Sequence, residues 1–193
     1  MRIRTLIAFS IFTISSTVLF AYSQNFTLAG SSQTAENSLP VVSPTPVKAK
    51  NAGVVFVTDW DGTKLERTEA EWKSMLTDVE YYVLREKGTE NPYTGKLTDN
   101  KVAGTYHCAA CGLALFSSKH KYDSQTGWPS FYQPINKTHV GELQDKSIPA
   151  EIRTEIVCAR CGSHQGHVFD DGPEPTGLRY CINSVALKFS KSK

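Results

Sequence analysis

The chain has almost no excess of charge of either sign. Its 193 residues include 21 basic and 19 acidic side chains, which gives a formal charge of +2. Two of the basic residues, Arg2 and Arg4, lie in a segment that we expect to be removed, and without them 19 basic residues stand against the 19 acidic ones. A neutral protein has no electrostatic basis for binding nucleic acid or an anionic membrane. We therefore expect neither as a stable partner.

Long helices between the strands are also missing. From Gly104 onward the sequence consists of short β-type runs broken by Gly, Pro and Asp, and it has no repeat beyond two cysteine pairs. Short strands without intervening helices favour an antiparallel sheet or sandwich over a parallel α/β fold. A chain of 193 residues that is 40% hydrophobic can bury one core. The strands that we predict cover residues 104–108, 113–117, 139–143, 153–158, 167–169, 180–183 and 185–189.

Helical patterns occur only before these strands. Residues 68–71 (Thr-Glu-Ala-Glu) fit a capping box, and Trp72, Met75, Leu76 and Val79 follow at helical spacing. A second helical segment runs from Val79 to Lys87 and ends at Gly88. Each segment has one apolar and one polar face, so we predict that both helices pack against a sheet.

Residues 1–23 have the three parts of an export signal. Arg2 and Arg4 come first, an apolar run from Leu6 to Phe20 follows, and small residues surround Tyr22. The alternatives are a buried helix or a retained membrane anchor, for which this serine-interrupted run is short. No cysteine follows the run, so a lipoprotein anchor is not indicated. We expect export, to the periplasm in a bacterium and otherwise to the secretory pathway or the cell exterior.

Residues 24–64 are predicted to be a flexible linker followed by an N-terminal strap. The first part is rich in Ser, Thr, Pro, Ala and Asn and shows no periodicity. The run Val54–Val57 could form a short edge strand or strap, and Asp61-Gly62 would then turn the chain. This leaves residues 65–193 as the folded domain.

Four of the five cysteines form two identical turns. Cys108 with Cys111, and Cys158 with Cys161, both have the pattern Cys-x-x-Cys-Gly. This spacing directs both sulfurs of a turn to one point, and two such turns complete a closed tetrahedral zinc site with a structural role. In an oxidising compartment each pair could instead close a disulfide. A zinc ribbon of this kind could also serve as a binding module.

Cys181 is the remaining cysteine and the candidate nucleophile. Arg179 and Asn183 lie two residues on either side, so on a strand all three side chains share one face. A nearby cation stabilises a thiolate and makes it reactive. The alternative is that Cys181 is an inert, buried, small apolar residue.

His164, His167 and Trp128 are further candidates. The two histidines follow directly after the second cysteine pair. They could bind zinc or form hydrogen bonds in the core, but the four paired cysteines already satisfy the metal. Trp128 lies in a Gly-Trp-Pro turn and could belong to the core or line a small apolar pocket.

Five motifs, taken in order, resemble those of one enzyme family. They are Gly-Thr-Glu-Asn-Pro-Tyr-Thr-Gly (88–95), Tyr-His-Cys-Ala-Ala-Cys-Gly (106–112), Gly-Trp-Pro-Ser-Phe (127–131), Gly-His-Val-Phe-Asp-Asp-Gly-Pro (166–173) and Arg-Tyr-Cys-Ile-Asn-Ser (179–184). The chain from about Thr68 to Ser190 is similar to the B-type methionine sulfoxide reductases, which reduce the R epimer of methionine sulfoxide. The resemblance implies a mainly β fold of two small antiparallel sheets, arranged as a sandwich or tent, with N-terminal helices and one structural zinc ion.

The same resemblance implies a role for each site residue. A cysteine attacks the sulfoxide sulfur, methionine leaves, and a sulfenic acid remains on the enzyme. Histidines and an asparagine protonate and hold the sulfoxide oxygen, an arginine lowers the pKa of the thiol, and aromatic residues bind the substrate. By match the catalytic residues are Cys181, His164, His167, Asn183 and Arg179, and the substrate-binding residues are Trp128 and Phe169.

Thr126 departs from the family pattern. Many members carry a resolving cysteine two positions before the tryptophan, where this chain has Thr126. We therefore expect a one-cysteine cycle in a monomer, with an external thiol as reductant: a thioredoxin-like protein, a glutaredoxin or a small thiol. The substrate would be free methionine sulfoxide or oxidised exported proteins. A thiol peroxidase and a zinc-ribbon interaction module with an inert Cys181 are the rival hypotheses.

Overall fold

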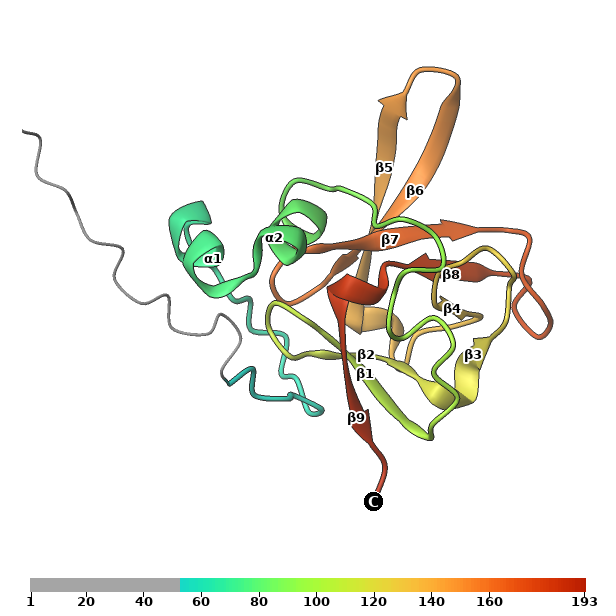
Figure 1. Ribbon diagram of the computed structural model, residues 1–193, viewed down its shortest axis with the longest axis horizontal. Coiled ribbons are helices and arrows are strands. Elements are labelled where there is room, and N and C mark those ends of the chain that lie inside the picture. Colours follow the sequence, from blue (N-terminus) through green and yellow to red (C-terminus); the bar gives the residue numbers. More distant parts are fainter. Residues whose placement is uncertain (1–52) are drawn as a thin grey trace, which may run out of the picture. The chain divides into compact units, whose positions relative to one another are not determined.

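The computed structural model describes residues 53–193, which form two short helices followed by two antiparallel β-sheets (Figure 1). The predicted mainly β fold with N-terminal helices is therefore confirmed. The predicted export signal and the linker up to residue 52 lie outside the described residues. Among the residues described, no helix has the length and apolar character needed to cross a membrane.

The helices α1 (Glu69–Met75) and α2 (Asp78–Leu84) each begin with a Thr-x-x-Glu capping box. The box at Thr68 was predicted, and the one at Thr77 was not. Because the second cap restarts the helix, Val79 does not continue the buried face of Trp72 and is 57% exposed. The helix ends before the predicted Lys87, which has a left-handed φ of 59°.

One sheet has three strands and the other has six. The smaller has the order β2 (Ala114–Ser117), β1 (Gly104–Cys108), β9 (Leu187–Lys191). The larger has the order β3 (Lys121–Tyr122), β4 (Ser130–Phe131), β8 (Arg179–Ile182), β7 (His164–Phe169), β6 (Glu151–Cys158), β5 (Val140–Ile148). All strand pairs in both sheets are antiparallel.

The structure corrects several predicted strand boundaries. The two-residue strands β3 and β4 carry too few residues for a sequence pattern. The strand predicted to begin at Val185 begins at Leu187, because a 3₁₀ helix occupies Ser184–Ala186. The strands β5 and β6 are longer than predicted and project from the sheet as a hairpin (Figure 1).

The core lies between the helices and the inner faces of the sheets. Its aromatic centre is formed by Phe116 and Phe131, which stack with ring centroids 4.5 Å apart. On β8 the buried Tyr180 and Ile182 alternate with the partly exposed Arg179 and Cys181. Full burial of each large apolar side chain contributes about 1.5–3 kcal/mol. Burial of one face of β8 therefore fixes Cys181 on the other.

The strap, residues 54–64, forms one bridge rather than a strand. Val57 pairs in parallel with Leu113, and its amide donates to the Gly112 carbonyl at 2.9 Å. Further along, the Lys64 ammonium donates to the Ala159 carbonyl at 2.6 Å. The strap thus contacts both cysteine turns. The domain boundary at residue 65 stays a prediction.

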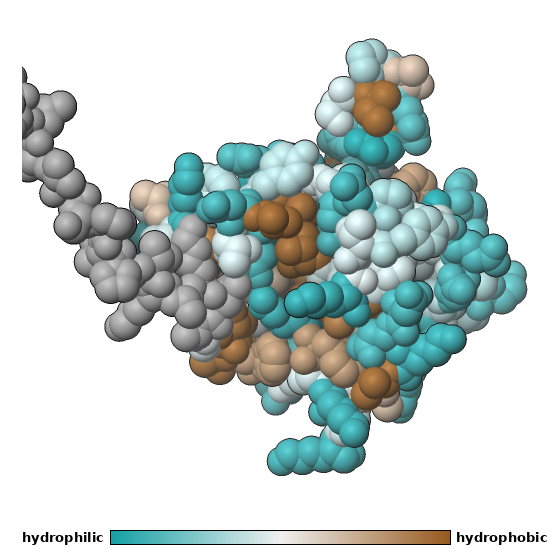
Figure 2. All heavy atoms as spheres, in the orientation of Figure 1, coloured by the Kyte–Doolittle hydropathy of each residue, from teal (hydrophilic) through white to brown (hydrophobic). Residues whose placement is uncertain are grey.

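Apolar surface is exposed in several places on the face shown in Figure 2, and two of them can be assigned to elements of the fold. One lies over α2, where Val79 lines an open pocket of about 480 Å³ that also includes Leu97 and Phe189. The other is the tip of the β5–β6 hairpin, where Ile148 and Ile152 are 41% and 68% exposed. Neither contains a cysteine or a histidine.

Candidate functional site

The four paired cysteines form a buried cluster. Their sulfur atoms all lie within 4.8 Å of one another, with 3.7 Å between Cys108 and Cys161 and 3.5 Å between Cys111 and Cys158. None of them forms a disulfide. Tetrahedral zinc with Zn–S bonds of about 2.3 Å places its sulfur ligands about 3.8 Å apart. The cluster is therefore consistent with one structural zinc ion, as predicted.

Glycine is required after each cysteine pair. Gly112 and Gly162 have φ of +80° and +70°, values that other residues rarely adopt. At Gly112 a Cβ atom would also lie 2.0 Å from the carbonyl oxygen of Val55 in the strap. Both amides close their turns, donating at 2.8 Å to the carbonyl of the first cysteine of the pair.

Cys181 lies in a row of side chains on one face of the larger sheet. It pairs directly with His167 on β7 and with Ser130 on β4, and His167 pairs with Glu155 on β6. Directly paired residues of antiparallel strands project from the same face, with Cβ atoms about 4.5–5.5 Å apart. The structure therefore brings the thiol and the His167 imidazole together.

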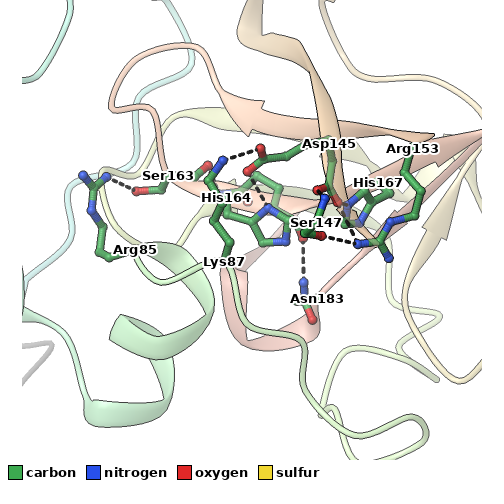
Figure 3. Close-up of polar contacts among 11 residues, drawn as sticks. Arg85, Lys87, Asp145, Ser147, Arg153, Ser163, His164, His167 and Asn183 are labelled. Carbon is green, nitrogen blue, oxygen red and sulfur yellow. Dashed lines mark hydrogen bonds and ion pairs between the residues drawn. The ribbon is translucent and has the colours of Figure 1, made fainter. Parts of the chain in front are cut away.

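His164 is held by a buried carboxylate (Figure 3). Its Nδ1 lies 2.8 Å from Glu155 Oε1, and Glu155 also accepts a hydrogen bond from Lys87 at 2.7 Å. Burial lowers the pKa of the imidazole more than Glu155 raises it, which favours a neutral ring with its proton on Nδ1. Its Nε2 is buried and has no hydrogen-bond partner among the described residues. Buried polar atoms usually have a partner, so this nitrogen is available to a water molecule or a bound ligand.

His167 is held by a second carboxylate, that of Asp145 on β5. Its Nε2 lies 2.8 Å from Asp145 Oδ2, which also accepts a hydrogen bond from Arg153 at 2.7 Å (Figure 3). Hydrogen bonds from Ser147, then from His167 and Arg153, hold the pKa of Asp145 well below its usual range. The two imidazole centroids are 5.4 Å apart, so the carboxylates orient His164 and His167 as a contacting pair.

Arg179 forms an ion pair with Asp171, so its charge is shared between this carboxylate and the thiol. It donates two hydrogen bonds of 2.8 Å to Asp171, and its guanidinium lies 4.3 Å from the ring centroid of Phe169. Burial raises the pKa of the Cys181 thiol, and Thr126 and Arg179 act in the opposite direction. Arg179 therefore lowers the pKa of the thiol, as expected, but in the resting protein burial raises that pKa by more.

Asn183 and Trp128 are both tied to the backbone of Glu90. Asn183 is buried just after β8, where its Oδ1 accepts from the Glu90 amide at 3.1 Å and its Nδ2 donates to the Gln165 carbonyl at 3.1 Å. The Trp128 indole donates to the Glu90 carbonyl at 3.1 Å. The Asn183 amide thus keeps one N–H group outside these bonds. The roles expected of both residues stay predictions.

Sequence reasoning missed three carboxylates that organise the site. Glu155 could have been found, because it is a charged residue at the start of the apolar run Ile156–Cys158 inside a predicted strand. Glu90, in the quoted motif 88–95, accepts hydrogen bonds from the backbone amides of Ser184 and Val185. Asp145 lies beyond the predicted end of its strand, and no pattern marks it.

The chain is similar to known proteins over most of this domain. Residues 76–191 match the family model described as the SelR domain. A protein from Methanosarcina mazei is 58% identical over 130 residues, which cover 67% of this chain and 92% of that protein. One from Leptospira interrogans is 56% identical over 128 residues, covering 66% and 97%. One from Pseudomonas putida is 56% identical over 126 residues, covering 65% and 94%. All three carry the name peptide methionine sulfoxide reductase MsrB.

Proposed function

Because the chain belongs to the SelR-domain family of MsrB peptide methionine sulfoxide reductases, we propose that it reduces the R epimer of methionine sulfoxide through Cys181. One observation carries this proposal: the only cysteine outside the metal cluster pairs directly with His167 on a partly exposed face of the sheet. This arrangement is what a thiol nucleophile with an adjacent acid–base group requires.

The reaction transfers one oxygen atom from substrate to enzyme. The Cys181 thiolate attacks the sulfoxide sulfur and forms an S–S bond, while a proton reaches the sulfoxide oxygen. Transfer of the hydroxyl to the cysteine sulfur breaks both the S–O bond and the new S–S bond. Methionine leaves, and Cys181 becomes a sulfenic acid, oxidised by two electrons. Each step conserves atoms and charge without a cofactor.

The chain's own residues can hold the proton that this step needs. His167 lies nearest to Cys181 in the strand register, and Asp145 fixes its ring through Nε2. The remaining N–H of Asn183 offers a donor to the sulfoxide oxygen, and the unprotonated Nε2 of His164 can accept the hydrogen of the hydroxyl that forms there. We assign Trp128 and Phe169 to the substrate's methyl and side-chain groups. The four cysteines would hold a structural zinc ion, which would keep β1 and β6 together without taking part in the chemistry.

We propose a one-cysteine cycle for regeneration. The chain has five cysteines, and four of them belong to the metal cluster. An external thiol then attacks the sulfenic acid, releasing water and forming a mixed disulfide, and a second thiol releases Cys181. The reductant is a thioredoxin-like protein, a glutaredoxin or a small thiol, acting on a monomer.

A single turnover without reductant tests both proposals. We expect the R epimer to remove one free thiol from the denatured, zinc-free protein and to add the mass of one oxygen atom. The S epimer should leave both unchanged. The matched control is Thr126→Cys, because Thr126 Oγ1 lies 3.8 Å from the Cys181 sulfur. This variant should lose two thiols and gain an intramolecular disulfide instead.

Three outcomes would contradict these proposals. An intramolecular disulfide in the parent protein would exclude the one-cysteine cycle, whereas equal reaction with both epimers would exclude R specificity. Faster reaction with hydrogen peroxide than with sulfoxide would favour a thiol peroxidase. Assays with free and with peptide-bound methionine sulfoxide would define the form of the substrate.

We further propose that the protein is exported and repairs oxidised proteins outside the cytosol. Support comes from Arg2, Arg4, the apolar run from Leu6 to Phe20 and the small residues that follow it. The mature protein should begin after residue 23, and the intact mass of protein purified from its own compartment measures this. Recovery of the full-length chain from the cytosol would contradict export.

A further inference from the structure

Three hydroxyl groups connect Cys181 to the backbone of the tryptophan turn. Thr126 Oγ1 lies 3.8 Å from the Cys181 sulfur, and Ser124 Oγ lies 2.8 Å from Thr126 Oγ1 and 2.7 Å from Ser130 Oγ. Ser130 in turn donates to the Trp128 carbonyl at 3.3 Å. We call Ser124, Thr126 and Ser130 the hydroxyl chain.

Counting protons gives the hydroxyl chain one direction when Cys181 is a neutral thiol. Each hydroxyl has one proton to donate. Because Ser130 donates to the Trp128 carbonyl, Ser124 must donate to Ser130 and Thr126 must donate to Ser124. The thiol then donates to Thr126. Every bond in the chain is satisfied in this state.

Loss of the thiol proton favours the reverse direction. A thiolate only accepts, so Thr126 turns its proton toward the sulfur, Ser124 donates to Thr126, and Ser130 donates to Ser124. The reversal gives up one bond, that of Ser130 to the Trp128 carbonyl, and at 3.3 Å it is the longest of the oxygen–oxygen bonds in the chain. In return a charge-assisted hydrogen bond forms at the sulfur.

We propose that the hydroxyl chain is a switchable donor that stabilises the Cys181 thiolate, with Thr126 as a catalytic residue that contacts the reacting sulfur. Ser124 is a positioning residue that acts through Thr126, and Ser130, which pairs with Cys181 across β4 and β8, anchors the far end of the chain. This inference deepens the proposed function and rests on it for the identity of the reaction. It gives Thr126 a role in activating Cys181, at the position where other family members carry a resolving cysteine.

The turn that carries the hydroxyl chain is held in place from a second loop. Tyr93 donates through its hydroxyl to the Gln125 carbonyl at 2.6 Å and through its amide to the Gly127 carbonyl at 2.8 Å. At Gly127 a Cβ would lie 2.7 Å from Pro92 Cβ, so the two loops approach as closely as glycine allows. Ser130 is fully buried. The donor therefore needs little rearrangement when the thiol ionises.

Other titratable groups also face the thiol. Arg179 lies beside it on β8 and is paired with Asp171, His167 lies opposite on β7, and Tyr122 lies beyond Ser130 on β3. Burial raises the pKa of Cys181, whereas Thr126, Arg179 and Ser130 lower it. A test of the hydroxyl chain must therefore keep these groups unchanged.

The test measures the rate of alkylation of Cys181 by iodoacetamide against pH, in the full zinc-loaded protein. Thr126→Val keeps the shape of the side chain and removes its donor. We expect the midpoint of the profile to rise by roughly one pH unit, since a hydrogen bond to a charged group is of that order. Thr126→Ser should restore the parent profile. Ser124→Ala should raise the midpoint by less, because Thr126 can still donate.

The outcomes separate this inference from the proposed function. A Thr126→Val profile that superimposes on the parent, or no shift in Ser124→Ala, overturns the hydroxyl chain. Alkylation needs no sulfoxide, so the expected shifts without any sulfoxide reduction would support the chain and reject the proposed reaction. Cys181→Ser measures background alkylation, and zinc content checks the fold of each variant.

Discussion

The Cys181→Ser variant is expected to lose turnover of methionine-R-sulfoxide by at least about 10³-fold, because a serine hydroxyl is a weak nucleophile and cannot form a sulfenic acid. The variant should keep one equivalent of zinc. The sulfur of Cys181 contacts Thr126, and the four metal ligands lie together within 4.8 Å without it. Steady-state rates with an excess of thiol reductant, together with metal analysis of the same sample, measure both results.

The site geometry explains why the two effects should separate. Cys181 is partly exposed on the outer face of β8, whereas Tyr180 and Ile182 bury the inner face. Exchange of sulfur for oxygen on the outer face leaves these core contacts intact. Turnover clearly above about 10⁻³ of the parent rate would assign the chemistry to another group. Loss of zinc would place Cys181 in the metal site.

The sequence predicted those features that depend on local or repeated patterns. The capping box at Thr68, the antiparallel strands and the cysteine cluster are all confirmed. A capping box involves four consecutive residues, and each Cys-x-x-Cys-Gly turn is fixed by its own spacing and by a glycine with positive φ. Such signals do not depend on the rest of the fold.

Features that depend on contacts distant in sequence were missed. The strands β3 and β4 have two residues each and are defined by pairing alone: Ser130 pairs with Tyr122 and Cys181, and Phe131 pairs with Lys121 and Tyr180. Asp145 reaches His167 across the sheet from the β5–β6 hairpin, a contact between residues 22 positions apart. A single sequence gives no register between strands, so it cannot place a carboxylate beside a particular imidazole.

The three hydroxyls beside Cys181 show the same division. Thr126 drew notice only as the absence of a resolving cysteine, because sequence shows what is missing at a position but not what the new residue contacts. The structure adds Ser124 and Ser130, which are connected through Thr126 to the sulfur. Thr126 is thereby a candidate for thiol activation, and its importance is not limited to the absence of a cysteine.

The Cys108→Ser variant is expected to lose the zinc ion and the fold together. Binding of structural zinc by small domains contributes about 10–16 kcal/mol, whereas the whole free energy of unfolding of a domain is about 5–15 kcal/mol. Cys108 is fully buried at the end of β1, and its sulfur lies 3.7 Å from that of Cys161. A serine there leaves a three-sulfur site and a buried hydroxyl. We expect well under one equivalent of zinc and no cooperative thermal transition.

Cys181→Ser is the matched control, since it makes the same exchange of sulfur for oxygen at the cysteine outside the cluster. Its thermal midpoint should stay close to that of the parent, while a strong chelator should bring the parent to the behaviour of Cys108→Ser. If Cys108→Ser kept one zinc and the parent midpoint, the cluster would not be the metal site. If the parent were folded, free of zinc and joined by two disulfides, the cysteine pairs would act as covalent links. We expect zinc and the thermal transition to be lost only when the cluster is changed. This result would show that the metal joins β1 to β6 and thereby supports β7 and β8, which carry His164 and Cys181.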